Sequence, residues 1–187
     1  MSTTEKRLKA TVMDADQIRR SLSRIAHEIA ERNRGIDGLV LVGVFSKGDH
    51  LARRLAANLA GLEGAAVAVG VLDTSKHRDD GHLRQPSHRA TSRIPEIDGK
   101  VVVLVDDVIH HGRTARAAMD ALMDFGRPRA IQLAVLIDRG HRELPIRPDY
   151  IGKNLPTARS ERIQVQLLEV DEIDQILLVP NPEEGSQ

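Results

Sequence analysis

The sequence predicts an α/β protein in which a mostly parallel sheet is covered by helices. Short runs of Val, Leu and Ile occur at residues 38–44, 67–72, 101–105 and 130–137, and continuous runs of this kind are typical of strands buried on both faces. Stretches with helical spacing or many alanines follow several of these runs. A chain of 187 residues is long enough for one such domain with a substantial core, and too short for two large ones.

The N-terminal part begins with a polar arm at residues 1–10, which we expect to be flexible, and a short edge strand at residues 12 and 13. Asp14 or Asp16 then caps a helix that runs to about Arg34 and ends at Gly35. Apolar side chains gather on one side of this helix and basic ones on the opposite side. The basic side is either an ordinary solvated face or a surface for a polyanion.

The turn after the strand at residues 38–44 is a candidate contact for pyrophosphate. Gly43 and Gly48 have the spacing of a Walker loop, but the next two residues are not the Lys and Ser or Thr that such a loop needs. The sequence therefore excludes an NTPase P-loop. A short turn that carries Ser46 and Lys47 between a strand and a helix still suits a pyrophosphate group.

A helix at about residues 49–60 and a strand at residues 67–72 lead into a long polar segment at residues 74–100. A structureless stretch of this length inside a compact domain is usually a lid or an insertion. We expect a flexible lid loop here, partly folded as a hairpin.

The central stretch at residues 101–114 ends an apolar strand with two adjacent carboxylates, Asp106 and Asp107. Gly112 then opens a helix that runs to about Phe125. A tight turn before a helix aims backbone N–H groups at an anion, which suits a phosphate. The two carboxylates suit a diol or a hydrated cation instead. A phosphorylated sugar offers both kinds of group, and ligands of open α/β sheets bind beyond the carboxyl ends of the strands.

The C-terminal part contains a buried strand at residues 130–137, a segment at residues 138–161 that is too irregular for a long helix, and two alternating strands at residues 163–168 and 175–179 that form a hairpin. The irregular segment is basic, with six Lys or Arg against three acids between Arg139 and Arg162. The last residues, 181–187, read as a tail.

Composition excludes several classes of function. The chain has no cysteine, so disulfides, thiolate chemistry and cysteine zinc sites are excluded. It has no apolar run of about 18 residues and no apolar signal core, so we expect a cytoplasmic protein without a membrane partner. Two Phe, one Tyr and no Trp argue against single-strand nucleic-acid binding by aromatic stacking. The formal net charge is zero, so anion binding depends on local patches.

The central stretch VVVLVDDVIHHGRT resembles the phosphoribosyl-pyrophosphate (PRPP) signature of the type I phosphoribosyltransferases. In that family the two acids bind the ribose 2′ and 3′ hydroxyls and the turn binds the 5′-phosphate. The order of expected elements is similar over nearly the whole chain. The resemblance implies a single domain over residues 1–187, with a central mostly parallel sheet flanked by helices, a hood region and C-terminal hairpin at residues 138–180, and a long flexible loop.

The stretch RSLSRIAHEIAERNRGIDG, the stretch from GRTARAAMDAL to GKNLPTARSE, and the short RDD at residues 78–80 resemble a narrower family, the bacterial pyrimidine-operon regulators that are also uracil phosphoribosyltransferases. This resemblance implies transfer of phosphoribosyl from PRPP to uracil, giving UMP and pyrophosphate, with Mg²⁺ on the PRPP. It also implies binding of a stem-loop in the pyr leader mRNA when UMP or UTP is present, and a homodimer or homotetramer.

The same resemblance implies the site residues. Four residues are expected to be catalytic: Asp106, Asp107, Arg78 and Lys47. The residues expected to bind PRPP or nucleotide are Ser46, Lys47, Gly48, Asp106, Asp107, Ile109, His110, His111, Gly112, Arg113, Thr114 and Arg139. No side chain is expected to bind the metal directly, because Mg²⁺ is held mainly by PRPP near the two aspartates.

The residues expected to contact RNA lie on the first helix and in the basic segment: Arg20, Ser23, Arg24, His27, His141, Arg142, Arg147 and Lys153. Their alternative role is an ordinary solvated surface, or a subunit interface rich in Arg. If these residues contact RNA, replacing Arg142 by Ala should weaken RNA binding and leave catalysis intact.

The sequence departs from the family pattern at the catalytic end. His110 and His111 stand where an aromatic residue and a Thr or Ser are usual, and Phe45 and Lys47 change the pyrophosphate turn. A protonated His111 would restore attraction to phosphate, so we expect nucleotide affinity to rise as the pH falls. His110 occupies the position of a general base in purine-specific relatives. Two alternatives follow: a nucleotide-sensing RNA-binding regulator with weak or no catalysis, or a phosphoribosyltransferase for another base without RNA binding.

Overall fold

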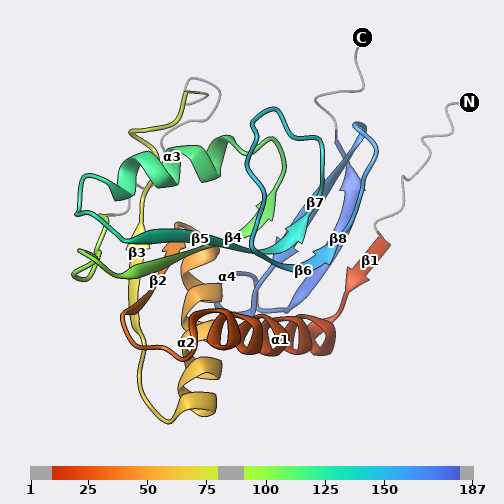
Figure 1. Ribbon diagram of the computed structural model, residues 1–187. Helices are drawn as coiled ribbons and strands as arrows, with labels where there is room; N and C mark the ends of the chain where they lie inside the picture. Colours follow the sequence, from red (N-terminus) through yellow and green to blue (C-terminus); the bar gives the residue numbers. More distant parts are fainter. Residues whose placement is uncertain (1–9, 80–90, 182–187) are drawn as a thin grey trace, which may run out of the picture.

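A five-stranded parallel sheet forms the centre of the molecule, in the order β3-β2-β4-β5-β6 (Figure 1). The computed structural model describes residues 10–79 and 91–181. The expectations for residues 1–9, for the middle of the lid at residues 80–90 and for the tail at residues 182–187 lie outside the described residues. The central strands are β2 (Leu39–Val44), β3 (Ala68–Leu72), β4 (Val101–Ile109), β5 (Ala130–Asp138) and β6 (Tyr150–Asn154).

Helices cover both faces of this sheet, as the continuous apolar runs predicted (Figure 1). The helices α1 (Ala15–Asn33) and α2 (Gly48–Glu63) pack on one face, and α3 (Arg113–Leu122) packs on the other. All six residues of β2 are buried, and so are the first five residues of β4. The predicted α/β fold is confirmed.

The first helix begins where the sequence predicted. Asp14 is its N-cap and forms a capping box with Gln17, which satisfies two backbone N–H groups at the helix start. The helix ends at Asn33 and is capped by Arg34, whose left-handed conformation comes one residue before the expected Gly35. Its apolar side is buried against the sheet and α2, and contributes Ile18, Leu22, Ile25 and Ile29 to the core.

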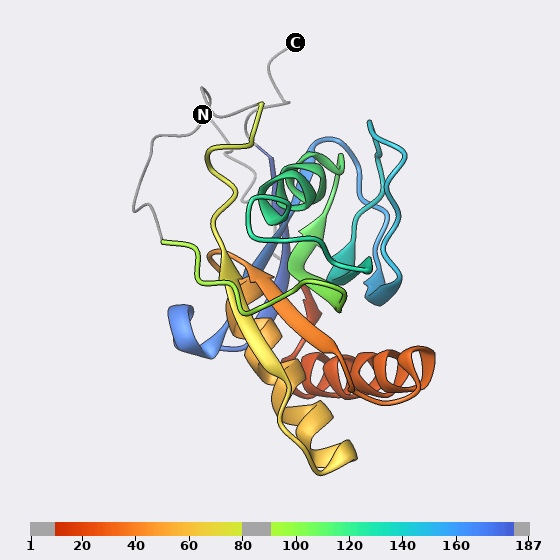
Figure 2. The same ribbon diagram turned by 60° about the vertical axis from the view of Figure 1, so that its left-hand side comes forward.

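A second, antiparallel sheet of three strands forms the hood. Its order is β1 (Ala10–Met13), β8 (Gln175–Pro180) and β7 (Glu161–Gln166), so the N-terminal edge strand and the C-terminal hairpin are both confirmed. A short helix, α4 (Leu168–Asp171), lies in the hairpin connection and was not predicted (Figure 2). The apolar side of the hood joins the core on the side of α1 and α2.

Two predictions about strands were wrong in their bounds. The segment 138–161 was expected to be too irregular for a long helix and no strand was predicted in it, but β6 lies within it and pairs in parallel with β5. Gly152 allows this pairing, because a Cβ there would lie 2.4 Å from the backbone oxygen of Leu136. The strand β4 also continues through Asp106 and Asp107, so the acids lie inside the strand and not after it.

The strand order has a switch point between β2 and β4, which predicts a ligand site there. From β2 the chain moves outward to β3, and from β4 it moves in the opposite direction to β5 and β6. Doubly wound sheets bind ligands beyond the carboxyl ends of the strands at such a switch point. The turns that meet there are residues 45–47 and residues 110–112. Within the described part of the chain, no helix is long and apolar enough to cross a membrane.

Candidate active site

The turn between β4 and α3 has the geometry of an anion site. Gly112 is the N-cap of α3 and has a φ of 92°, a conformation that favours glycine. No side chain caps the helix. The free N–H groups of the first helical turn and the positive end of the α3 dipole therefore lie at the same place, where a phosphate was expected.

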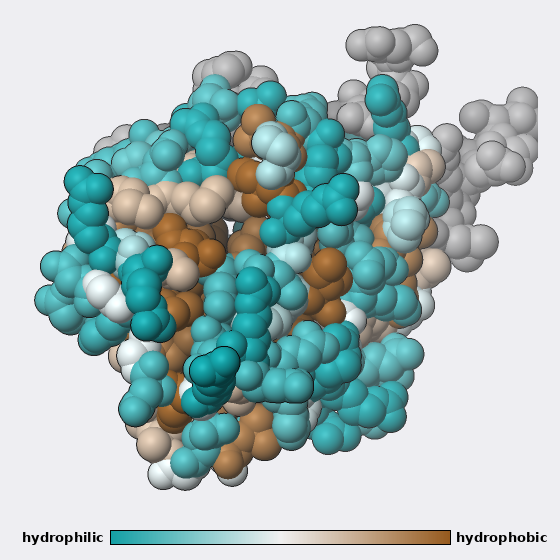
Figure 3. Space-filling view, in the orientation of Figure 1, coloured by the Kyte–Doolittle hydropathy of each residue, from teal (hydrophilic) through white to brown (hydrophobic). Residues whose placement is uncertain are grey.

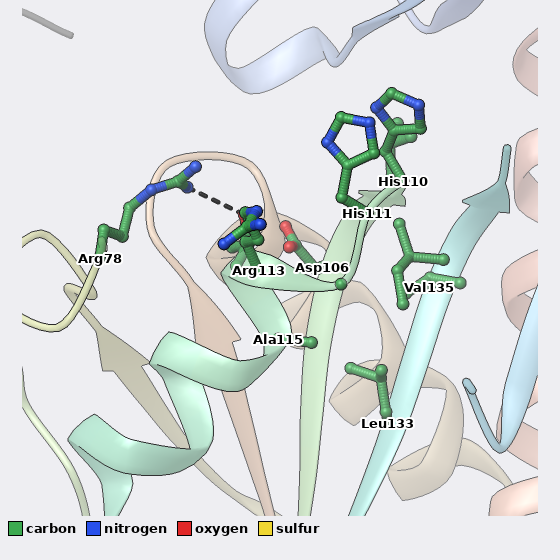
Figure 4. A pocket seen from close by; sticks show the side chains of 12 residues that line it. Arg78, Asp106, His110, His111, Arg113, Ala115, Leu133 and Val135 are labelled. Carbon is green, nitrogen blue, oxygen red and sulfur yellow. Dashed lines mark hydrogen bonds between the residues drawn. The ribbon is translucent and has the colours of Figure 1, made fainter. Parts of the chain in front are cut away.

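A cavity of about 200 Å³ opens beside this turn. Figure 4 shows Asp106, His110, His111 and Arg113 around it, together with apolar side chains from α3 and β5. Its lining residues are Arg78, Asp106, Val108, Ile109, His110, His111, Gly112, Arg113, Thr114, Ala115, Leu133 and Val135. Eight of the residues expected from the sequence, namely Arg78, Asp106 and the run 109–114, are thus brought together.

The two aspartates are half-buried and face different sides of β4. Asp106 lines the cavity on the side of α3, and alternation along a strand turns Asp107 to the side of Lys47. Burial raises the pKa of Asp106 well above its usual range, and the charge of Asp107 adds to the effect. Burial also raises the pKa of Asp107, although main-chain N–H groups and Lys47 act to lower it. Adjacent carboxyl groups with raised pKa values favour a ligand that donates hydrogen bonds or brings a cation.

The turn at residues 45–47, the candidate contact for pyrophosphate, packs closely because of two glycines, with Gly48 against β4 and Gly43 against the start of α2. A Cβ at Gly48 would lie 2.3 Å from the backbone oxygen of Val105, and a Cβ at Gly43 would lie 2.3 Å from Cα of Asp49. The peptide bond before Ser46 is cis. The close approach sets the turn beside Asp106, as expected for neighbouring pyrophosphate and ribose contacts.

Lys47 is engaged by the hood in this structure. Its ammonium group donates to the backbone oxygen of Val165 and to Oδ2 of Asp171, 2.7 Å away. Burial acts to raise the pKa of Asp171, but the hydrogen bonds from Lys47 and from the N–H of Leu167 outweigh it, so the pKa is lowered. Lys47, which was expected to contact pyrophosphate, therefore forms an ion pair with Asp171 of α4.

Arg113 is also paired within the protein. Its Nε donates to Glu143 at 2.8 Å and its Nη1 donates to Asp79 at 2.8 Å. Arg78, at the start of the expected lid, donates to the hydroxyl of Thr114 at 2.9 Å. The charges of the phosphate turn are thus partly neutralised by acids from two other segments.

The segment after β5 forms the back wall of the phosphate turn. The N–H group of Arg139 donates to Ile109, and the N–H groups of Glu143 and Leu144 donate to His111. Arg142 donates to the backbone oxygen of His110 at 2.9 Å. This part of the expected hood is therefore fixed to the nucleotide turn by several hydrogen bonds.

Three imidazoles gather at this wall. His110 and His111 stack with ring centroids 3.6 Å apart, and His141 meets His110 edge-on at 5.8 Å. Burial lowers the pKa of His110 to about 4, and the charge of Arg139 contributes to the effect. His110 is therefore neutral at pH 7.

Part of the expected RNA surface is assembled on α1 and β6. Arg20, Arg24 and Lys153 line one shallow depression of about 320 Å³. Arg24 donates to the backbone oxygens of Ile151 and Gly152, at 3.0 and 2.7 Å. Figure 3 shows that the surface over α1 is mainly hydrophilic.

The other residues expected to contact RNA differ in how exposed they are and in where they lie. Ser23 and His27 lie on α1 and are half-buried and exposed, respectively. His141 and Arg147 are exposed in the wall segment, whereas Arg142 is largely buried there by its hydrogen bonds. The eight residues therefore divide between the α1 side and the wall of the nucleotide site.

Several site residues were missed from the sequence. Glu143 and Asp171 pair with cations of the two ligand turns, and nothing in their spacing marked them. Leu133 and Val135 line the cavity, and strand alternation would have found them, since they pair with Leu104 and Asp106 of β4.

Comparison with known proteins identifies the family. A model described as phosphoribosyl transferase domain matches residues 13–171. The protein named bifunctional protein PyrR of Pelotomaculum thermopropionicum is 55% identical over 179 residues, covering 95% of this chain and 99% of that protein. Proteins of the same name from Brevibacillus brevis and Chloroflexus aurantiacus are both 56% identical, over 89% and 90% of this chain and 94% and 93% of their own lengths.

Solved structures support the fold. The hypoxanthine phosphoribosyltransferase of Trypanosoma cruzi in complex with the product IMP has a TM-score of 0.69 at 20% identity, covering 97% of this chain and 95% of that one. The hypoxanthine-guanine phosphoribosyltransferase of Leishmania tarentolae in complex with GMP has a TM-score of 0.66 at 19% identity, covering 92% and 97%. The chain therefore belongs to the phosphoribosyltransferases and, among them, to the family of bifunctional PyrR proteins, as the sequence predicted.

Proposed function

We propose that this chain transfers the phosphoribosyl group of PRPP to uracil, giving UMP and pyrophosphate, and that it binds a stem-loop of pyr leader mRNA in response to UMP or UTP. The observation that carries the proposal is the cavity at the switch point, which combines Asp106 with an uncapped phosphate turn. The high identity to proteins named bifunctional PyrR supports both activities.

The arrangement suits phosphoribosyl transfer. The turn 110–113 offers N–H groups to the 5′-phosphate, Asp106 and Asp107 accept hydrogen bonds from the ribose hydroxyls, and the turn that carries Ser46 and Lys47 receives the pyrophosphate. In the reaction the bond from ribose C1 to pyrophosphate breaks, a bond from C1 to the uracil nitrogen forms, and the nitrogen loses its proton. Positive charge from Lys47 and Arg78 stabilises the departing pyrophosphate.

Magnesium fits this site as a companion of PRPP. Asp106 and Asp107 supply carboxylate oxygens, which Mg²⁺ prefers as ligands. Among the described residues no group of three or more His, Cys, Asp or Glu is arranged to hold a metal. A magnesium ion here would therefore depend on PRPP oxygens, with the aspartates nearby. Its chemical contribution when bound is to neutralise charge on the pyrophosphate.

The basic side of α1 supports the RNA proposal. Arg20, Arg24 and Lys153 place three cations around one depression, and cations gathered on one face suit the phosphates of a double-helical stem. The hydrogen bonds from Arg24 to β6 tie this face to the sheet that carries the nucleotide site. The proposed assembly is a homodimer or homotetramer, and the proposed place of action is the cytoplasm, where the RNA partner is made.

A second candidate is a nucleotide-sensing RNA-binding regulator with weak catalysis. It is favoured by the pairing of Lys47 with Asp171, because a cation held by an acid is less available to pyrophosphate. The departures from the family pattern at Phe45 and His111 also favour a regulator with weak catalysis.

Two assays separate these candidates. Formation of UMP is measured from uracil and PRPP with Mg²⁺, and retention of a pyr leader stem-loop is measured with and without UMP. Turnover together with UMP-dependent retention supports the bifunctional proposal, and retention without turnover selects the regulator. Turnover without retention removes the RNA claim. Arg20→Ala and Lys153→Ala should weaken retention by roughly tenfold together and leave turnover unchanged.

A further inference from the structure

Arg139 is held rigidly behind the phosphate turn. Its residue exposure is 7%, and its guanidinium is fixed from two sides. Nε donates to the hydroxyl of Thr157 at 2.7 Å, and Nη2 donates to the backbone oxygen of Glu161. Its third nitrogen, Nη1, lies 3.2 Å from Nδ1 of His110.

The chemistry of this contact determines where the proton of His110 lies. A guanidinium has only N–H groups and remains charged in proteins, so it can only donate. Nδ1 of His110 must therefore accept, which requires a bare nitrogen there. A neutral imidazole with a bare Nδ1 carries its proton on Nε2.

The surroundings of His110 keep the ring neutral. The groups that face it are Arg139, the stacked His111, the edge of His141 and, more distantly, Glu143. Burial and the positive charge of Arg139 act together to lower the pKa of His110 to about 4. The single acid, Glu143, has its strongest contact with Arg113 instead.

We propose that Arg139 is a positioning residue that fixes the His110 ring with its proton on Nε2, so that His110 presents a hydrogen-bond donor and not a base to the nucleotide cavity. The proposal rests on the function proposed above, since it concerns what the cavity binds. A ring whose Nδ1 is occupied and whose Nε2 is protonated has no lone pair to take a proton from a nucleobase. It pairs with an acceptor oxygen, either of the phosphate or of a base carbonyl.

This assignment bears on base choice. The sequence resemblance placed His110 where purine-specific relatives carry a general base, which left a purine substrate open. A fixed donor means that His110 is not the base that takes the proton from the nucleobase nitrogen, whichever base is bound. Its Nε2–H can instead pair with a carbonyl oxygen, such as those of uracil.

The test is the ¹⁵N spectrum of the imidazoles in the full chain at pH 7.5, where ring nitrogens with and without a proton have well separated shifts. His110 is identified by the signals lost in His110→Asn. We expect a protonated Nε2 and a bare Nδ1. A proton on Nδ1, or on both nitrogens, overturns the proposal. Because this spectrum is measured with Arg139 in place, the result does not depend on whether a variant of Arg139 folds.

Three variants separate the proton assignment from general damage to the wall. Arg139→Met removes the donor, and the signals of His110 should move to a mixture of both neutral forms. Thr157→Val removes a different hydrogen bond of Arg139, and His110 should keep its proton on Nε2. An unchanged spectrum in Arg139→Met overturns the positioning role. Recovery of the original spectrum in Arg139→Lys, which again offers a donor, supports it.

Ligand titrations identify the acceptor. UMP and ribose 5-phosphate are added separately, and the Nε2 proton of His110 is followed. A shift with both ligands assigns the acceptor to the sugar phosphate, and a shift with UMP alone assigns it to the base. No shift with either, when calorimetry shows that UMP binds, overturns the donor role. If UMP does not bind at all, the proposed function fails, while the spectrum without ligand still decides the proton assignment.

Affinity gives an independent readout. Asn at position 110 retains an N–H donor, so His110→Asn should change UMP affinity by about threefold or less. His110→Asp replaces the donor by an anion, so affinity should fall more than about tenfold. Equal losses in the two variants count against a donor at this position.

Discussion

Nη2 of Arg142 lies 2.6 Å from Oδ2 of Asp138, and the two side chains are only 20% and 14% exposed. The other guanidinium nitrogens donate to the backbone oxygens of Ile146 and His110, at 2.8 and 2.9 Å. Arg142 therefore joins the end of β5 to the phosphate turn. A side chain used in this way supports the proposed nucleotide site, and any contact of Arg142 with RNA would be a second role.

This contact changes the expectation for Arg142→Ala. The variant leaves the Asp138 carboxylate without its cation and frees the wall of the phosphate turn, so it should destabilise the fold by about 2–3 kcal/mol. UMP affinity and turnover should fall with RNA binding, whereas the sequence alone suggested a loss of RNA binding only. Thermal unfolding and calorimetry with UMP measure the two effects.

Arg147→Ala is the matched control, because Arg147 is an exposed cation of the same segment and its loss should change stability by less than about 0.5 kcal/mol. Normal UMP binding in Arg142→Ala contradicts the structural role.

Asp106→Asn should stabilise the fold and abolish activity. Burial, with the charge of Asp107, raises the folded-state pKa of Asp106 above its unfolded value. The native state then holds more protons than the unfolded state between the two pKa values, so stability falls as the pH rises through that window. The neutral amide of Asn removes the cost of the charge at this position, so the free energy of unfolding should rise by about 1–2 kcal/mol at neutral pH.

The measurement is thermal unfolding together with PRPP binding. Unfolding should shift upward by roughly 2–8 °C, and PRPP binding should be lost because the ribose contact is gone. Asp37→Asn changes an exposed acid outside the site and should alter neither quantity. A lower unfolding temperature in Asp106→Asn would show that the carboxylate supports the ligand-free fold.

The strongest sequence signals were those that depend on local periodicity. The apolar runs predicted four of the five central strands, and Asp14 was one of the two caps predicted for the start of α1. The acids of β4 were recognised because they follow such a run directly. These features depend on neighbouring residues, which the sequence displays.

The missed features depend on residues far apart in the chain. β6 was overlooked because Pro148 precedes it and Gly152 interrupts it, and its strand character comes from pairing with β5. The partners of Arg113 and Lys47 are 30 and 124 residues away, so no spacing reveals them. The same holds for Arg142, whose exposure depends on how the wall segment folds back onto His110.

Glu143→Gln should strengthen binding of a sugar phosphate. The hydrogen bond from Arg113 lowers the pKa of Glu143, so this acid is ionised at neutral pH beside the phosphate turn. Removing its charge releases Arg113 from one of two acids and reduces repulsion of the incoming anion. Because the pair is exposed to solvent, the gain should be modest, about threefold in affinity.

Calorimetry with ribose 5-phosphate at low ionic strength measures this gain, which should shrink as salt is added. Glu63→Gln is the control, since it removes the same charge from the exposed end of α2. Weaker binding in Glu143→Gln would mean that Glu143 serves mainly to hold Arg113 in place.

His110 should make the fold sensitive to acid. Its pKa is lowered from the ordinary 6.5 to about 4, first by burial and then by Arg139, so between these values the unfolded state binds more protons than the native state. Stability contributed by the neutral ring is therefore complete above pH 6.5 and is lost as the pH falls toward 4. Because the ring is partly exposed, we expect this loss to be about 1 kcal/mol. Urea unfolding at pH 7.5 and pH 5 should show a smaller drop in His110→Asn than in the original chain, while His27→Asn, with His110 in place, should keep the full drop. Equal drops in all three proteins would mean that protonation of His110 is not linked to folding, and the contact with Arg139 would then have to tolerate a charged ring.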